Sequence, residues 1–215
     1  DARRLAEEVI DCGKFALVNY EKSLNTDEAN KDLLFSDEHI FSLRGQNVKS
    51  DAEGVHKQIT GTDGNVQMAS GYQSILYLGD LEDYRLNWYK SFYIIKYTSD
   101  NSERFFPKMP MIRLSEMYLI AAEGWMEDDP EHAAELLQTL KQARTKSIVN
   151  KQTVTEEMIL LEMRKEFVGE GQLFYVYKRL NHDIIGNTSE DGVKASNRVF
   201  VLPLPEEEIE YGYRN

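Results

Sequence analysis

Cysteine is nearly absent from this sequence, and long apolar runs are missing altogether. The 215 residues contain one cysteine, Cys12, so neither a disulfide within the chain nor a cysteine-rich metal site is possible. No segment approaches the roughly 20 uninterrupted apolar residues of a membrane-spanning helix, and the first residues do not resemble a signal peptide. The composition, 41% apolar and 29% charged, is that of a globular protein.

Positive charge is also in short supply. The 25 lysines and arginines are outnumbered by 37 aspartates and glutamates, which gives a formal net charge of -12. Nucleic-acid phosphates and anionic membrane surfaces would repel such a chain. We therefore expect its main partner to be a neutral ligand or a protein.

Sequence signatures of catalysis and of metal binding are missing too. There is no Gly-x-Ser-x-Gly elbow, no phosphate-binding loop and no dinucleotide fingerprint. The four histidines are scattered without the spacing of metal ligands: His39, His56, His132 and His182. The sequence therefore predicts no catalytic residue, no metal site and no cofactor.

A glycoside hydrolase is the strongest enzymatic alternative, because it needs only two carboxylates about 5 to 10 Å apart across a sugar. Glu162, Glu166 and Glu170 recur every four residues, which places them on one face of a helix. Such a row pairs readily with Arg164, Lys165 or the cations of a neighbouring helix. Structural ion pairs are therefore predicted here in preference to catalysis.

The clearest structural pattern lies in residues 106–124, where prolines precede a helix with small residues on its apolar face. The apolar positions recur at helical spacing: Leu114, Met117, Ala121 and Trp125. After a turn at residues 128–130 a second apolar face follows: Ala133, Leu136, Leu137 and Leu140. Because alanines let two helices approach closely, the pattern predicts an antiparallel helical hairpin.

Further helices are predicted on both sides of this hairpin. The chain begins with a periodic segment over residues 1–10, and a short helix is expected near residues 25–34. Another long helix opens at Thr155, with acidic residues in its first turn. Gly169 and Gly171 are expected to break that helix.

Residues 35–105 form a loop-rich stretch in which glycines interrupt polar and aromatic residues. Its best strand candidate is residues 91–98. Flat aromatic rings and planar polar groups suit the C–H faces and hydroxyls of sugars. The candidate ligand residues are Tyr72, Tyr84, Arg85, Asn87, Trp88 and Tyr89. Packing in the core is the alternative for each of them, because aromatic residues beside a strand commonly pack.

Three separated motifs carry a resemblance to a known family. They are PMIRLSEMYLIAAE at residues 110–123, EMRKEFVGEG at residues 162–171 and LPLPEEEI at residues 202–209. In order and spacing they resemble the C-terminal portion of the SusD/RagB-like nutrient-binding lipoproteins of the Bacteroidetes outer membrane. Two positions, Gln172 and Val176, depart from the pattern of that family.

The resemblance implies a mainly α fold built from tetratricopeptide-like helical hairpins, an α-α superhelix with little β structure. Residues 1–215 would form a single SusD/RagB-like domain, the later part of a longer chain. Within it, residues 35–105 would be a loop-rich insert and residues 106–215 the helical core.

The resemblance also implies a function without catalysis. Such a protein captures glycans or other oligomeric nutrients and passes them to a SusC-like TonB-dependent transporter. It would be a surface-exposed lipoprotein of the cell outer membrane, held by a lipid anchor upstream of this chain. A helical-repeat module that binds another polypeptide is the alternative, with a glycoside hydrolase less favoured.

Overall fold

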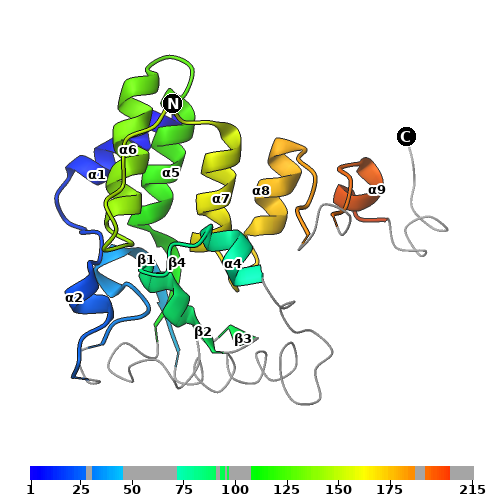
Figure 1. Cartoon of the computed structure of the whole chain (residues 1–215). Coiled ribbons are helices and arrows are strands. Elements are labelled where there is room, and N and C mark those ends of the chain that lie inside the picture. Colours follow the sequence, from blue (N-terminus) through cyan, green and yellow to red (C-terminus); the bar gives the residue numbers. More distant parts are fainter. Residues whose placement is uncertain are drawn as a thin grey trace. The chain divides into compact units, whose positions relative to one another are not determined.

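The computed structural model describes residues 1–27, 31–45, 72–90, 93–94, 96, 108–186 and 192–203 of the chain. The chain divides into two compact units, Asp1–Gly169 and Glu170–Asn215. Helices dominate the described parts of both units, which confirms the mainly α class with little β structure (Figure 1). That residues 1–215 form a single domain stays a prediction.

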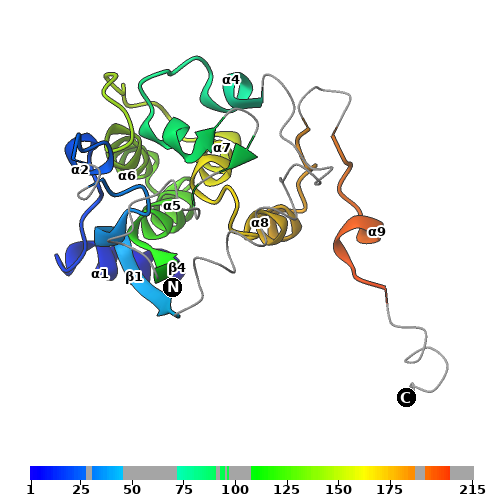
Figure 2. The same cartoon turned by 90° about the horizontal axis from the view of Figure 1, so that it is seen from below.

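Four helices pack together in the first unit. They are α1 (Ala2–Asp11), α5 (Leu114–Trp125), α6 (Pro130–Gln142) and α7 (Glu156–Glu166). Helix α5 contacts each of the other three (Figure 2). None of the helices in the described ranges combines the length and the apolar character that crossing a membrane requires.

Helices α5 and α6 form the predicted hairpin. The predicted apolar face of α6 is buried throughout: Ala133, Leu136, Leu137 and Leu140. On α5, Leu114 and Ala121 are buried as expected, whereas Met117 and Trp125 are only half-buried. The core positions on α5 also include Leu119 and Ala122.

The ends of α6 and α7 follow from their sequence. The side chain of Asp129 accepts the backbone N–H of His132 at 3.1 Å, and Pro130 occupies the first turn of α6. The Thr155 hydroxyl accepts the N–H of Met158 at 3.3 Å, which confirms the predicted start of α7. After Glu166, the last residue of α7, the chain leaves helical geometry.

Two glycines account for the break after α7. Gly169 and Gly171 have φ angles of 74° and 76°, in the left-handed region that glycine adopts without steric cost. Ahead of them, Ile159, Met163 and Phe167 point into the core as the periodicity predicts.

Helix α1 approaches the end of α5 closely. A Cβ atom on Gly124 would lie 2.6 Å from the Cβ of Arg3, too close for an ordinary contact. The Arg3 guanidinium donates to the carbonyl oxygen of Gly124 at 2.8 Å and lies 3.9 Å from the ring centre of Trp125. The missing side chain at position 124 therefore lets the two helices meet.

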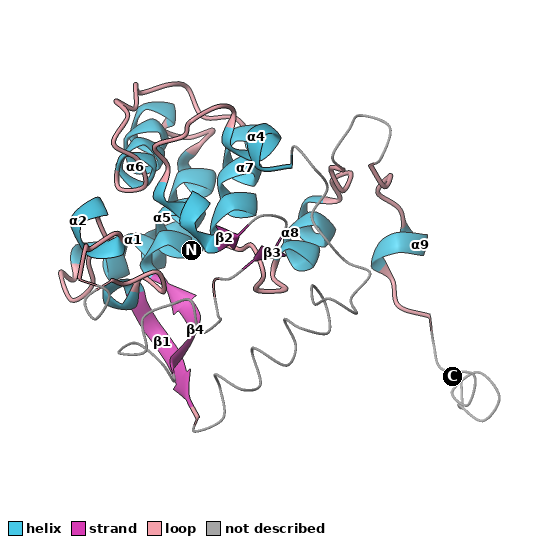
Figure 3. Ribbon diagram, turned by 60° about the horizontal axis from the view of Figure 1, so that its bottom comes forward, coloured by secondary structure: helices cyan, strands magenta, loops and turns pink. Residues whose placement is uncertain are grey.

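Two small antiparallel pairs supply the β structure of the described residues. Strand β1 (His39–Arg44) pairs with β4 (Lys108–Arg113), as Figure 3 shows, and β2 (Tyr89–Lys90) pairs with β3 (Tyr93–Ile94). No pattern in the sequence predicted β1 or β4. Pro110 lies in β4 opposite Ser42, and β4 tolerates it as an edge strand of the described sheet.

The remaining short elements are α2 (Tyr20–Ser23), η1 (Ser36–Glu38), α4 (Tyr72–Tyr77), η2 (Tyr84–Trp88), α8 (Leu173–Leu180) and α9 (Asn197–Phe200). Helices α8 and α9 belong to the second unit. There the rings of Phe174 and Phe200 lie 5.9 Å apart, and Ile184 and Val193 form an isolated β-bridge.

The strand predicted in residues 91–98 and the helix predicted near residues 25–34 had different outcomes. In residues 91–98, Tyr93 and Ile94 are a strand, while 91, 92, 95, 97 and 98 lie outside the described residues. The helix expected near residues 25–34 is wrong for residues 25–27 and 31–34, and residues 28–30 lie outside the described ranges. The Asp32 carboxylate accepts the N–H groups of Leu34 and Ser36 at 3.1 and 2.8 Å, and such local bonds compete with helix formation.

We predict that Ala121→Leu lowers the free energy of unfolding by about 1 to 3 kcal/mol, because Ala121 is fully buried in α5 and the extra atoms would overpack the core. Urea titration measures the change. Ala2→Leu is the matched control, since Ala2 lies exposed on α1. Equal stabilities of the two variants would contradict the packing assignment.

Candidate functional site

Five of the six candidate ligand residues lie on one short segment that runs through η2 into β2. They are Tyr84, Arg85, Asn87, Trp88 and Tyr89. Tyr72 lies on a different element, at the start of α4. The Asp83 side chain caps η2 by accepting the backbone N–H of Arg85 at 3.0 Å, which fixes where the segment begins.

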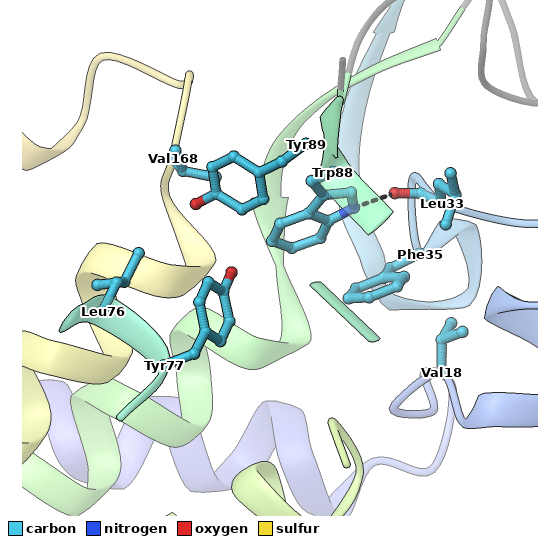
Figure 4. Packing of buried hydrophobic residues seen from close by; sticks show 8 residues of the cluster. All are labelled: Val18, Leu33, Phe35, Leu76, Tyr77, Trp88, Tyr89 and Val168. Atoms are coloured by element: carbon cyan, nitrogen blue, oxygen red, sulfur yellow. Dashed lines mark hydrogen bonds between the residues drawn. The ribbon is translucent and has the colours of Figure 1, made fainter. Parts of the chain in front are cut away.

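Trp88 belongs to the aromatic core of the first unit (Figure 4). Its side chain is 0% exposed, and its indole N–H donates to the carbonyl oxygen of Leu33 at 2.7 Å. The Phe35 ring lies 5.0 Å from the Trp88 ring, and the Lys96 ammonium group lies 3.8 Å from its centre. Packing accounts for the position of Trp88, and a ligand contact there stays a prediction.

The tyrosines of the segment are buried as well. The rings of Tyr89 and Tyr77 meet edge to face at 6.1 Å, and the rings of Tyr84 and Tyr20 lie 5.2 Å apart. Burial raises the pKa of Tyr77 well above its usual value, and the neighbouring Tyr89 raises it further. Asn87 is half-buried and donates its side-chain N–H to the Tyr84 carbonyl oxygen at 2.9 Å. Asn87 is thus less enclosed than Tyr84, Trp88 and Tyr89.

Arg85 is buried and surrounded by carboxylates. Its Nη2 donates to Asp83 Oδ2 at 2.6 Å, and its Nη1 lies 3.0 Å from both Glu162 Oε2 and Glu166 Oε1. Burial alone would lower the pKa of Arg85, but Asp83 and Glu162 outweigh it and raise the pKa well above its usual value. Arg85 is therefore a permanent internal cation that links η2 to α7.

Glu166 lies at the centre of the buried charges. Arg144 Nε donates to its Oε1 at 2.6 Å, Arg113 Nη1 donates to its Oε2 at 2.9 Å, and Arg85 completes the set. Burial alone would raise the pKa of this carboxyl. Arg144, Arg85 and Arg113 outweigh burial and hold the pKa well below its usual value. Glu166 is thus ionised in the interior.

The backbone of Glu166 is engaged by cations too. Glu166 is the last residue of α7, where carbonyl groups have no partner within the helix. Its carbonyl oxygen accepts Lys96 Nζ at 2.7 Å and Arg113 Nη2 at 2.8 Å. These cations satisfy a helix-end acceptor and complement the negative end of the helix dipole.

Two further carboxylates extend the cluster. Glu38 lies 2.8 Å from Arg144 Nη1, and Glu162 accepts from Lys165 Nζ at 2.8 Å. We call this set the ion cluster: Glu38, Asp83, Arg85, Arg113, Arg144, Glu162, Lys165 and Glu166.

The predicted ion-pair role of Glu162 and Glu166 is confirmed, with Lys165 as one partner. The other partners were not predicted from the sequence. Arg85 was grouped with the ligand residues, and Arg113, which is buried, was not among the predicted partners. Arg144 was not singled out, because nothing in its local sequence distinguishes it from a surface arginine.

A protein-family model described as the SusD family matches residues 37–210 of the chain. The chain belongs to the SusD family. The motif resemblance found in the sequence is thereby confirmed.

Solved structures of the SusD superfamily have the same fold. One, from Bacteroides thetaiotaomicron, is 26% identical, with a TM-score of 0.73 over 98% of this chain and 54% of its own. A putative sugar binding protein from Bacteroides vulgatus is 24% identical, with a TM-score of 0.69 over 96% and 52%. The chain spans about half the length of these proteins. No curated protein matches it.

One further relative was solved with a bound sugar. It is the surface glycan-binding protein A from Bacteroides thetaiotaomicron in complex with laminarihexaose. Its identity to this SusD-family chain is 16%, with a TM-score of 0.60 over 98% of this chain and 57% of its own. At this identity the likeness concerns the fold.

Glu162 and Glu166 of this SusD-family chain are unsuited to general acid catalysis. A catalytic acid needs a raised pKa and access to the leaving oxygen. Both carboxyl groups are buried, and burial alone would raise their pKa values. Neighbouring cations outweigh burial and lower the pKa of both, with Arg85 the strongest for Glu162 and Arg144 the strongest for Glu166. The described residues also contain no cluster of three or more His, Cys, Asp or Glu side chains able to hold a metal ion.

We predict that Arg144→Met lowers the free energy of unfolding by about 3 to 5 kcal/mol, because Glu38 and Glu166 would keep their buried charges without this partner. Lys151→Met is the control, since Lys151 pairs with Glu131 at the surface and its loss should change stability little. Thermal and urea unfolding measure both. Similar losses in the two variants would contradict the assigned role of Arg144.

Acid should weaken the ion cluster. Because folding lowers the pKa of Glu166, its stabilising effect is present above the unfolded-state value near 4.5 and is lost as the pH falls toward the folded pKa. The difference in the free energy of unfolding between wild type and Glu166→Gln should therefore be largest at about pH 7 and shrink below about pH 4.5. Urea unfolding across this range tests it, with surface Glu127→Gln as control. A difference independent of pH would refute the assignment.

Proposed function

We propose that this chain is part of a non-catalytic protein that captures glycans for a TonB-dependent transporter. The observation that carries the proposal is membership of the SusD family over residues 37–210. The sugar-binding description of one similar structure and the laminarihexaose bound in another support a glycan as the ligand. The ionised, enclosed state of Glu162 and Glu166 supports a role without hydrolysis.

The proposal places the full-length protein at the cell outer membrane. It would be a surface-exposed lipoprotein held by a lipid anchor outside these 215 residues, beside a SusC-like transporter that takes up the captured glycan. A net charge of -12 does not oppose the capture of a neutral glycan, whose binding relies on stacking and hydrogen bonds. These 215 residues would be the later part of that longer protein.

The contacts to the glycan belong to the same proposal. Arg85, Trp88 and their tyrosine neighbours are buried, so we assign them the indirect role of holding the η2 segment in shape. Half-buried Asn87 offers a planar amide for hydroxyl groups. Tyr72 begins α4 and is kept from the sequence as the proposed aromatic contact; its side chain lies outside the described part of the structure.

The test is a binding screen of the full-length protein against a panel of oligosaccharides, followed by calorimetry on each hit and a parallel assay for new reducing ends. We expect saturable binding without release of reducing ends. Hydrolysis would overturn the proposal. The absence of both binding and hydrolysis would also overturn the proposal and would favour a polypeptide partner for the helical repeats.

One variant addresses the site within the same screen. Asn87→Ala should weaken glycan affinity by roughly fivefold to tenfold, about the effect of losing one hydrogen bond to a neutral group. Asn150→Ala is the control, because Asn150 is exposed on the loop after α6. Equal affinities of the two variants would remove Asn87 from the site while leaving glycan capture itself in place.

A further inference from the structure

Residues 32–39 lead the chain through η1 to the first residue of β1, and we call them the His39 turn. Within it, Phe35 has φ and ψ angles of 56° and 52°, in the left-handed region. This backbone conformation carries a steric cost for a residue with a bulky side chain. Such a residue persists only where the surrounding contacts hold it in place. The His39 turn is therefore a strained segment whose closed form depends on its contacts.

Hydrogen bonds from two sides hold this turn closed. The Asp32 carboxylate accepts the N–H groups of Leu34 and Ser36 at 3.1 and 2.8 Å and the Ser36 hydroxyl at 2.6 Å. From η2, the Trp88 indole N–H donates to the Leu33 carbonyl oxygen at 2.7 Å (Figure 4). Both oxygens of Asp32 are thereby engaged within the turn itself.

The imidazole ring of His39 adds a third contact. Its Nε2 atom lies 2.9 Å from the Leu34 carbonyl oxygen. Because a carbonyl oxygen only accepts hydrogen bonds, Nε2 carries the proton, and Nδ1 of the neutral ring carries none. Nδ1 is buried, and no group among the described residues forms a hydrogen bond with it. The closed turn thus fits the neutral ring, because a proton on Nδ1 would be a buried donor without an acceptor in the described part of the chain.

The charges around the ring also disfavour a second proton. Arg113 lies opposite His39 in the pairing of β1 with β4, and Lys108 begins β4. Burial lowers the pKa of His39 below its usual value, and Arg113 and Lys108 lower it further. The hydrogen bond to Leu34 and the negative charge of Asp32 oppose this shift without cancelling it. The ring is therefore neutral in neutral solution.

We propose that His39 is a pH-sensitive switch that holds the His39 turn closed while its ring is neutral and releases the turn when Nδ1 takes up a proton. The charged ring leaves the Leu34 carbonyl oxygen for solvent, where water accepts its second N–H. The turn then lacks one of the contacts that hold Phe35 in its left-handed conformation, and the steric cost of that conformation favours opening.

Opening of the turn reaches two other parts of the first unit. The centre of the Phe35 ring lies 5.0 Å from that of Trp88 and 4.4 Å from the guanidinium carbon of Arg144. Glu38, the last residue of η1, lies 2.8 Å from Arg144 Nη1. The switch therefore acts on the support of η2 and on one arm of the ion cluster. It goes beyond the proposed function, since it makes no use of a ligand or a partner.

The switch works at a higher pH than the one that weakens the ion cluster. Because folding lowers the pKa of His39 from its usual value of 6.5, the closed turn is fully stabilised above that value and loses stability as the pH falls below it. Glu166 stays ionised there, because cations hold its pKa well below the usual value of 4.5. Opening of the turn thus precedes the loss of the ion cluster on acidification.

The test is amide hydrogen exchange of the full-length protein between about pH 7.5 and pH 5, corrected for the intrinsic exchange rate at each pH. The amides of Leu34, Ser36 and Glu38 donate hydrogen bonds within the turn. Their protection should fall roughly threefold or more over this range, because each unit by which folding lowers the pKa of His39 contributes up to about tenfold. The amides of Leu137 and Leu140 in α6 should keep their protection.

His39→Gln separates the switch from a general effect of acid. The glutamine amide can donate to the Leu34 carbonyl oxygen but takes up no proton, so the protection of the turn should become independent of pH. His182→Gln is the matched control, because the His182 ring lies in the second unit, with its Nδ1 atom 2.8 Å from the Asp183 carbonyl oxygen.

Loss of the pH dependence in His39→Gln, with the dependence retained in His182→Gln, supports the inference. Retention of the dependence in His39→Gln overturns it, because another group must then be responsible. Loss of the dependence in both variants, or its absence in the wild type, overturns it as well.

A measurement on the wild type decides the matter if His39→Gln does not fold. Isotope labelling of the histidines shows by NMR which ring nitrogen carries the proton and at which pH each ring titrates. A proton on Nε2 of His39 in neutral solution, with a pKa below that of free histidine, supports the inference. A proton on Nδ1 in neutral solution, or a pKa at or above that of free histidine, overturns it.

Discussion

The ionised carboxylate of Glu166 lies in the interior of the first unit, and the arrangement of the unit depends on satisfying it. An unpaired charge in that position would be strongly destabilising, so cations must surround it. They come from three separate places in the chain: Arg85 in η2, Arg113 at the end of β4, and Arg144 after α6. All three reach the two carboxylate oxygens of Glu166, so the contacts hold these segments together.

A buried ion cluster of this kind is weak evidence for high stability, because desolvation offsets much of the attraction between the charges. The main effect of the ion cluster is to fix the positions of chain segments relative to the helices of the first unit. The helices α5, α6 and α7 also pack through buried apolar residues, among them Ala121, Leu137 and Ile159. The ion cluster, together with Lys96 at the end of α7, ties the non-helical segments to that helical framework.

Local patterns in the sequence predicted the parts of the fold that local interactions build. The apolar face of α6, the Thr155 cap and the break at Gly169 all follow from residues within a few positions of one another. The β1 and β4 strands are some 70 residues apart in sequence and pair in short, irregular runs, so no periodicity revealed them. Arg85 and Trp88 resembled surface ligand residues because composition does not distinguish an exposed polar aromatic stretch from one folded inward. Family motifs identified the relatives but carried no code for the ligand.

The ion cluster joins charged residues of the η2 segment to carboxylates of α7, and this limits how the segment can change between related proteins. The segment from Asp83 to Lys96 supplies part of the buried charge. Its Arg85 side chain binds Glu162 and Glu166 on α7, and Lys96 binds the backbone carbonyl oxygen of Glu166. A loop recombined from a relative would therefore be accepted only if it carried matching anchors at the positions of Arg85 and Lys96. Between those anchors Trp88 and Tyr89 pack in the aromatic core, so such a loop must also carry side chains of similar bulk at both positions. Variation in this region is thus most accessible through exchange of the whole segment together with its anchors.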